Sequence, residues 1–219
     1  MIRNLYKKRV VMAFDSWAAT YESDVRDKIN RRGYSYASLG LAIVNRIHAK
    51  AGDTVLEVGT GPGNLGIEVN GACGFQLVGI DISGRMLEKA NEKTVYTSLI
   101  RANAQSLPFS DGSFDCAYSA FVFHSLIDQY CGFRELYRIL RPGAFAAIID
   151  LYPAGTSVWK TAVAGLFHAI RYEFGAPAIY VPLEYTANAA RKAGFNVCSV
   201  EPIGQKRDYT HCIVTVNKL

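Results

Sequence analysis

The sequence lacks the features that mark several classes of protein. Its 219 residues include only 7 prolines and 19 glycines without a repeating period, which excludes collagen-like and low-complexity chains. No apolar run reaches the roughly 20 residues that a membrane-spanning helix needs, so we expect no membrane span. The first residues, MIRNLYKKRVVMAFDSW, contain no continuous apolar core or cleavage site, so we expect no secretory signal.

Cysteine is also scarce, and its placement is irregular. The five cysteines form no C-x-x-C pair, which argues against a zinc site or a redox dithiol. An odd number of thiols without a pairing pattern is typical of a reducing compartment. We therefore expect a cytoplasmic protein without a bound metal.

The sequence has no long stripe of one charge. The net charge of +5 comes from residues 1–50, which hold 10 Lys/Arg against 4 Asp/Glu, whereas the rest hold 14 against 15. The basic excess could attract an anionic ligand. A solvated helical segment is favoured instead, because acidic residues interrupt the basic ones. Without a basic face or a separate binding module, a nucleic-acid partner is not expected.

What the sequence does contain is a regular alternation of strand and helix patterns. Half of the residues are hydrophobic, enough for one large core. Such alternation predicts an α/β fold, a mainly parallel sheet with helices on both faces, and the short final connection predicts an antiparallel last pair. Phe14, Trp17 and Tyr21 have the spacing of one helix face. Strands are predicted at 54–58, 76–81, 97–101, 114–121, 144–150, 196–201 and 211–216, and helices at 35–49, 65–70, 83–93, 128–140 and 183–193.

A glycine-rich turn follows the first predicted strand. Gly61-x-Gly63-x-x-Gly66 satisfies the fingerprint of a dinucleotide-binding turn, and Asp81 lies 20 residues after Gly61, where a ribose-binding acid is expected. A nicotinamide-dependent oxidoreductase therefore stays open.

Glu57 separates the two cofactor classes. It stands two residues before Gly59, and a carboxylate there repels a pyrophosphate but suits a cationic amine or sulfonium. S-adenosylmethionine carries both groups, and its ribose diol suits Asp81. Because both acids are expected at open strand ends, each should contribute about 1.5–3 kcal/mol to ligand binding and little to folding.

These residues lie in a longer pattern that resembles the class I S-adenosylmethionine-dependent methyltransferases. The similar branch acts on small molecules and includes ubiquinone/menaquinone- and biotin-pathway methyltransferases. The resemblance covers residues 10–150 well, and it implies a Rossmann-like seven-stranded sheet of order 3-2-1-4-5-7-6 with strand seven antiparallel. The matching segments are 14–21 (FDSWAATY), 55–63 (VLEVGTGPG), 78–87, 102–115 and 136–143.

The resemblance also implies roles for individual residues. Asn103 stands where the family usually has Asp, so adenine binding is expected to be weaker but the cofactor the same. Implied for the cofactor are Glu57, Gly59, Thr60 and Gly61 at the methionine end, Asp81 at the ribose, Ile82, Met86, Asn103 and Ala104 at the adenine, Ser119 near the sulfonium, and Tyr21 closing over the methionine end.

The acceptor is expected to be a small molecule. Methyl transfer needs mainly alignment and exclusion of water, and His124 or Asp150 could serve as a base where the acceptor is a hydroxyl, phenol or amine. Seven aromatic residues within 151–185 suggest an apolar or aromatic acceptor. We expect one domain over 1–219, with a helical lid at about 1–34 and a helical cap at about 151–185. O-, N- or C-methylation and a non-catalytic S-adenosylmethionine-binding protein all stay open.

Overall fold

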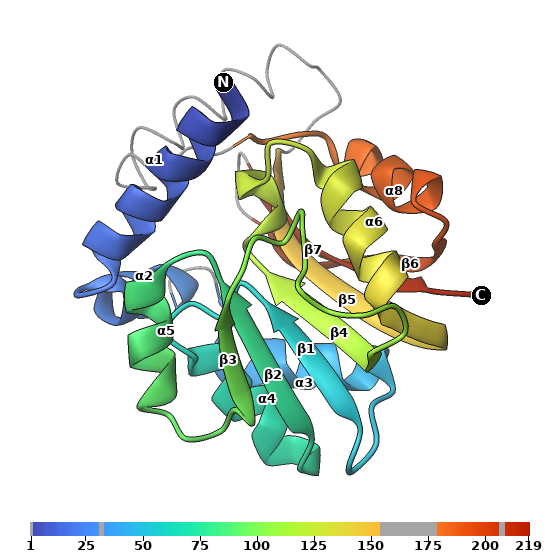
Figure 1. Ribbon diagram of the computed structural model, residues 1–219, viewed down its shortest axis with the longest axis horizontal. Coiled ribbons are helices and arrows are strands. Elements are labelled where there is room, and N and C mark those ends of the chain that lie inside the picture. The colour runs from blue at the N-terminus through green and yellow to red at the C-terminus, as the bar shows by residue number, and fades with distance from the viewer. Residues whose placement is uncertain (1, 31–32, 154–178, 206–208) are drawn as a thin grey trace.

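The sheet has the predicted order. The computed structural model describes residues 2–30, 33–153, 179–205 and 209–219. Within them, seven strands form one sheet, β3-β2-β1-β4-β5-β7-β6 (Figure 1). β7 is antiparallel to both neighbours and the other pairs are parallel, which confirms the prediction. The strands are β1 Thr54–Val58, β2 Gln76–Asp81, β3 Ser98–Arg101, β4 Phe114–Ala120, β5 Leu140–Pro153, β6 Asn196–Gln205 and β7 Tyr209–Asn217.

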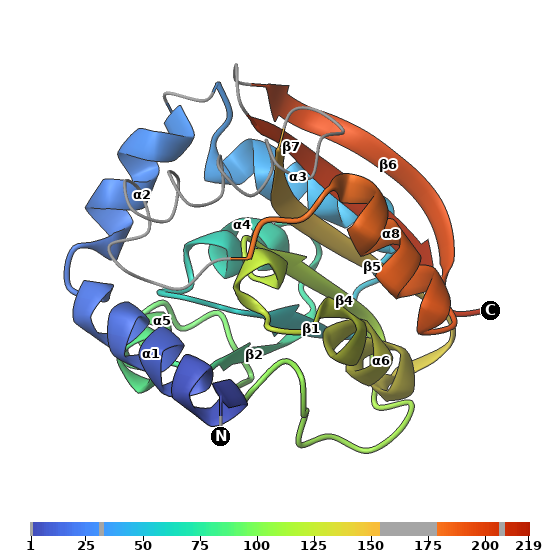
Figure 2. The ribbon, with the colours of Figure 1, turned by 90° about the horizontal axis from the view of Figure 1, so that it is seen from above.

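Helices cover both faces of the sheet, as expected from the alternating pattern. α3 (Tyr36–Ile47) and α4 (Asn64–Cys73) pack on one face, and α6 (Gln129–Ile139) and α8 (Leu183–Lys192) pack on the other (Figure 2). α5 (Gly84–Asn91) contacts β2 and β3. No helix in the described ranges is long and apolar enough to span a membrane.

The two hydrophobic clusters divide the side chains of β1 between these faces. Val55 belongs to the cluster beneath α3 and α4, whereas Leu56 and Val58 belong to the cluster beneath α6 and α8. Successive side chains of a strand point to opposite faces. Glu57 therefore lies on the same side as Val55, beneath α4.

The N-terminal helix differs from the prediction. α1 spans Ile2–Trp17, and after a turn α2 spans Tyr21–Asn30. Phe14, Trp17 and Tyr21 are thus not on one helix. Their rings still form a continuous stack, with centroid distances of 6.2 Å for Phe14–Trp17 and 4.7 Å for Trp17–Tyr21. The helical spacing predicts the helix correctly up to Trp17, but it does not indicate the turn at residues 18–20.

β5 also begins earlier than predicted. The segment Arg141-Pro142-Gly143 was expected to separate the helix from the strand, but Leu140 follows α6 directly and already pairs with Phe114. The next paired residues are Cys116 and Phe145, so the strand carries an irregularity at this point. Because an irregular strand position does not need every backbone N–H for pairing, it can accommodate the proline.

α1 is anchored to the start of α5 across the carboxyl ends of the strands (Figure 1). The Ser83 hydroxyl caps α5 by accepting from the Met86 N–H at 3.1 Å. The same hydroxyl donates to Oδ1 of Asp15 on α1 at 2.5 Å. One buried serine therefore both starts α5 and holds α1 in place.

We expect Ser83→Ala to lower the free energy of unfolding by about 1–2 kcal/mol, because the N-cap of α5 and the contact with α1 are both lost. Urea denaturation followed by circular dichroism measures this. Ser23→Ala is the matched control, since the exposed Ser23 hydroxyl donates to the Thr20 carbonyl and its loss should change stability by less than about 0.5 kcal/mol. Equal effects of the two substitutions would contradict the anchoring role.

Candidate functional site

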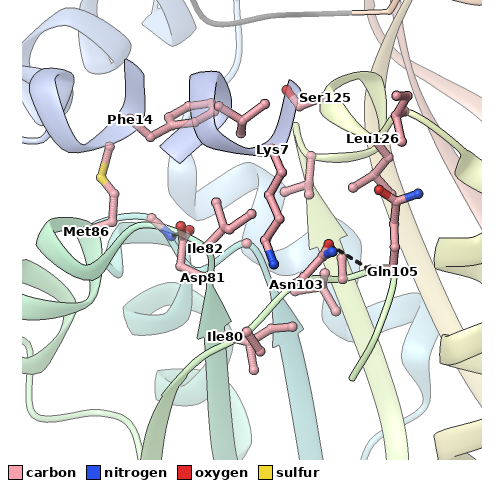
Figure 3. Close-up of a pocket in the computed structure, with 18 of the residues that line it drawn as sticks. Lys7, Phe14, Ile80, Asp81, Ile82, Met86, Asn103, Gln105, Ser125 and Leu126 are labelled. Atoms are coloured by element: carbon pink, nitrogen blue, oxygen red, sulfur yellow. Dashed lines mark hydrogen bonds between the residues drawn. The ribbon is translucent and has the colours of Figure 1, made fainter. Parts of the chain in front are cut away.

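A cavity of about 420 Å³ lies at the carboxyl ends of the strands, under α1 (Figure 3). This volume is in the range that holds a small molecule or cofactor. The wall is built from the ends of β1, β2 and β4, from residues 102–105 and from α1. The predicted residues that line it are Tyr21, Gly59, Gly61, Asp81, Ile82, Met86, Asn103 and Ala104.

Among the described residues that line this cavity, Asp81 has the only acidic side chain. Its Oδ2 accepts a hydrogen bond from the Gly61 N–H at 2.9 Å, and its Oδ1 accepts one from the Ser83 N–H at 2.8 Å. Burial raises the pKa of the Asp81 carboxyl. Each oxygen retains a further lone pair, so the fixed carboxylate can accept hydroxyl groups of a ligand.

These contacts correct the expectation that Asp81 contributes little to folding. The carboxylate joins the turn after β1 to the start of α5, and its removal would leave two backbone donors without their partner. Unsatisfied donors destabilise a folded protein by about 1–3 kcal/mol. Asp81 therefore serves the fold as well as the cavity.

The glycine-rich turn runs along the cavity wall. The N–H groups of Gly59 and Thr60 both donate to the Ile80 carbonyl, at 2.8 and 2.9 Å, which ties the turn to β2. Gly59 has a φ of +76°, and a Cβ there would lie 2.1 Å from Cγ2 of Val122. A Cβ on Gly61 would meet nothing within 4 Å, so the turn is open toward the cavity at that residue. The buried Thr60 side chain does not line the cavity.

Glu57 does not lie at an open strand end, and that expectation is wrong. Its side chain is 2% exposed, beneath α4, and is not part of the cavity wall. Tyr96 donates a hydrogen bond from its hydroxyl to Oε2 of Glu57 at 2.6 Å. Burial raises the pKa of the Glu57 carboxyl to about 8, so the group is mostly protonated at neutral pH in this state. The burial of Glu57 could not be predicted from the sequence, because no motif marks Tyr96 as its partner.

An apolar wall and an amide face each other across the cavity. Ile82 and Met86 lie on one side, and Asn103 lies beyond them (Figure 3). Oδ1 of Asn103 accepts a hydrogen bond from the Gln105 N–H at 3.1 Å, which fixes the orientation of the amide. The neutral amide at this position can offer both an acceptor and a donor to a ligand.

α1 supplies cavity residues that the sequence did not reveal as such. Phe14 and Lys7 extend from α1 toward the strand ends, with Lys7 reaching toward Asn103 (Figure 3). Lys7 belongs to the basic N-terminal segment for which the sequence favours a solvated helix, because acidic residues interrupt the basic ones. A contact between α1 and strands far along the chain leaves no local pattern in the sequence.

The two candidate bases form one buried pair. Nδ1 of His124 lies 2.6 Å from Oδ1 of Asp150, and the His124 N–H donates to Oδ2 of Asp150 at 2.8 Å. Neither residue lines the cavity, although Val122 and Ser125 beside His124 do. Ser119 is also buried, and its hydroxyl donates to the Val58 carbonyl at 3.0 Å. Of the cap expected at about 151–185, residues 154–178 lie outside the described residues.

Part of the chain matches a known protein family. Residues 56–148 match the family described as a methyltransferase domain. The match spans both the glycine-rich turn and Asp81, the two features that left a nicotinamide-dependent oxidoreductase open. That alternative is not favoured. The resemblance to methyltransferases of small molecules is confirmed over this stretch.

Individual relatives agree with the family match. The chain is 34% identical over 114 residues to the O-methyltransferase resE of Aspergillus sclerotiorum, covering 48% of this chain and 42% of that protein. It is 32% identical over 115 residues to the ubiquinone/menaquinone biosynthesis C-methyltransferase UbiE of Geotalea daltonii, covering 49% of each. The matched part thus spans about half the length of these relatives.

A solved structure shows the same fold over more of the chain. Geranyl diphosphate C-methyltransferase from Streptomyces coelicolor, in complex with S-adenosyl-L-homocysteine, superimposes with a TM-score of 0.69. The superposition covers 84% of this chain and 76% of that one, at 12% identity. At this identity the likeness shows the fold alone.

Glu57 predicts a pH dependence of stability. Its pKa is raised in the folded protein, so the folded state keeps a proton that the unfolded chain releases above the ordinary value of 4.5. The stabilising contribution is full below that value and is lost as pH rises toward about 8. In Glu57→Gln, the free energy of unfolding should therefore fall less between pH 5 and 8 than in the wild type.

Urea denaturation at several pH values measures the difference. Glu68→Gln is the control, because Glu68 is an exposed residue on α4 and its substitution should leave the wild-type pH profile unchanged. Parallel profiles for the wild type and Glu57→Gln would show that Glu57 is ionised in the folded protein.

Proposed function

We propose that this protein is an S-adenosylmethionine-dependent methyltransferase that acts on a small-molecule acceptor and releases S-adenosylhomocysteine. The observation that carries the proposal is Asp81, which lines the cavity with both oxygens held by the N–H groups of Gly61 and Ser83. A carboxylate fixed at the end of β2, beside a glycine turn, is suited to a ribose diol. The methyltransferase relatives support the same cofactor.

The residues around the cavity fit the parts of this cofactor. The turn at Gly61 leaves open space for the methionine end, and the apolar side chains can enclose the adenine. Asn103 can accept from the adenine amino group, but without the charge of an aspartate. We assign Gly59 and Gly61 to the methionine end, Asp81 to the ribose, Ile82, Met86, Asn103 and Ala104 to the adenine, and Tyr21 to closure.

S-adenosylmethionine supplies a methyl group that its sulfonium has already activated. The chain then has to align the acceptor and exclude water, which is mostly a proximity effect. α1 covers the cavity and Tyr21, the first residue of α2, lines it, so both can exclude water. The proposal needs no base from the buried His124–Asp150 pair. We assign the pair to holding the segment 121–126, of which Phe121, Val122, Ser125 and Leu126 line the cavity.

The acceptor that suits this cavity is apolar or aromatic. Its wall carries apolar side chains from α1 and from the segment after β4. These apolar residues are Val10, Phe14, Phe121, Val122, Leu126 and Ile127. Two of the relatives are named as C-methyltransferases, one of ubiquinone/menaquinone biosynthesis and one of geranyl diphosphate. The atom methylated can be oxygen, nitrogen or carbon.

The binding of S-adenosylhomocysteine to Asp81→Ala tests the proposal. The variant loses the ribose-binding carboxylate, and its affinity in calorimetry should fall by roughly 10- to 150-fold, the equivalent of about 1.5–3 kcal/mol. Its free energy of unfolding without ligand should also fall, because Gly61 and Ser83 lose their acceptor. Asp111→Ala is the control, since the Asp111 side chain is 81% exposed and lies outside the cavity wall.

The outcomes separate the functional alternatives. Wild-type binding of S-adenosylhomocysteine, with none of NADH, supports the proposal. Tight binding of NADH in place of S-adenosylhomocysteine would establish an oxidoreductase. Cofactor binding without methyl transfer to any of a panel of phenols, quinols and isoprenoids would indicate a non-catalytic binding protein.

A further inference from the structure

Tyr96 is a half-buried residue that the proposed function leaves without a role. It lies in the segment between α5 and β3, outside the cavity wall. Its hydroxyl donates to Oε2 of Glu57 at 2.6 Å. The two residues are 39 positions apart, so the pair joins the end of β1 to the segment before β3. A tyrosine hydroxyl buried against a carboxyl group is a specific contact, because each group would otherwise lack its partner.

The surrounding glycines leave space for this ring. A Cβ on Gly66 would lie 2.1 Å from the Tyr96 hydroxyl oxygen and 2.5 Å from Cζ. A Cβ on Gly63 would lie 3.1 Å from Cε2, and one on Gly79 would lie 3.0 Å from Cδ1. The ring therefore occupies a slot between α4 and β2 that exists because three residues have no side chain. Gly63 and Gly66 belong to the fingerprint, and here they admit a tyrosine.

The slot lies directly behind the ligand-binding turn. Glu57 precedes Gly59 in the chain, and Gly59 and Gly61 line the cavity on the other side. Tyr96 contacts the start of α4 from below while its hydroxyl holds the Glu57 carboxyl. Movement of either group would be transmitted to the turn, because the turn is short and tied to the Ile80 carbonyl.

We propose that Tyr96 is a positioning residue for the cofactor site, which acts by fixing the Glu57 carboxyl behind the glycine turn and so supports the turn from the side away from the cavity. This inference rests on the proposed function. It assigns the site a residue that does not touch the cofactor.

The groups around Glu57 determine how this support depends on pH. Three residues shift the pKa of the Glu57 carboxyl: Tyr118 on β4, Asp81 at the end of β2, and Tyr96 between α5 and β3. The residue of α4 that lies near the carboxyl is Gly66, which is neutral. Among the described residues that shift this pKa, none is cationic. A bound cationic amine would therefore favour the ionised carboxyl, and the Tyr96 hydroxyl also stabilises that form as a donor. Cofactor affinity should rise with pH as Glu57 ionises.

The experiment measures S-adenosylhomocysteine affinity by calorimetry between pH 6 and 9. The wild type should bind more tightly as pH rises, with a midpoint near 8. Tyr96→Phe keeps the ring but loses the donor, so the midpoint should move up by roughly one pH unit. Affinity should then be about 10-fold weaker at pH 7.5 and about twofold weaker at pH 9. Glu57→Gln should show no such pH dependence.

Two further variants keep the test decisive. Tyr137→Phe is the matched control, because Tyr137 packs against Phe195 and is not part of the cavity wall, and it should match the wild type at every pH. Gly66→Ala adds a Cβ that displaces the Tyr96 hydroxyl and should shift the midpoint in the same direction as Tyr96→Phe. Circular dichroism establishes that each variant is folded before binding is measured.

Failure of this inference is distinguishable from failure of the proposed function. If the wild type does not bind S-adenosylhomocysteine, the proposed function falls. If the wild type binds but Tyr96→Phe and Gly66→Ala keep its midpoint, or if its affinity is independent of pH, the positioning role is overturned and the cofactor assignment stands. A uniform loss of affinity at all pH values would show Tyr96 to be structural only.

Discussion

The carboxylate of Asp81 is the contact on which the rest of the site depends. One oxygen holds the N–H of Gly61 and the other holds the N–H of Ser83, so a single side chain fixes both the turn after β1 and the start of α5. Ser83 in turn caps α5 and contacts Asp15. Three segments that are distant in the chain therefore take their positions from the end of β2. The same carboxylate faces the cavity, where a ligand can use its remaining lone pairs.

β1 contributes to the site in two ways, through the turn that follows it and through the buried side chain of Glu57. Its backbone leads into the turn that lines the cavity, while Glu57 points to the opposite face of the sheet and meets Tyr96 beneath α4. This arrangement follows from strand geometry, because adjacent side chains must point to opposite faces. The same strand therefore leads into a ligand-binding turn at its end and buries an acid on one of its faces, next in the chain to apolar residues that are buried on the other face.

Local patterns in the sequence were sufficient for most of the fold. The glycine turn, the helix expected from residue 83 and the strand ending at Asp81 depend on neighbouring residues, so their positions could be predicted. The strand order came from the resemblance to a family. The pairing of Glu57 with Tyr96 could not be found in this way, because it depends on which face of the sheet each side chain occupies.

The same limitation applies to the remaining corrections. His124 and Asp150 were selected separately as bases, and only their distance shows that they satisfy each other in the core. The turn that separates α1 from α2 between Trp17 and Tyr21 leaves no mark in the helical spacing of these residues. Contacts between distant segments decide these features, and single-sequence patterns report on near neighbours.

The attachment of α1 through Ser83 has a consequence for the kinetics of ligand exchange. α1 covers the cavity but is not a member of the sheet, and the Asp15–Ser83 hydrogen bond joins it to α5. An opening that breaks this bond would leave all strand pairs intact and would require far less free energy than global unfolding. Entry and departure of small molecules can therefore proceed through a partial opening of α1, while the sheet itself stays unchanged.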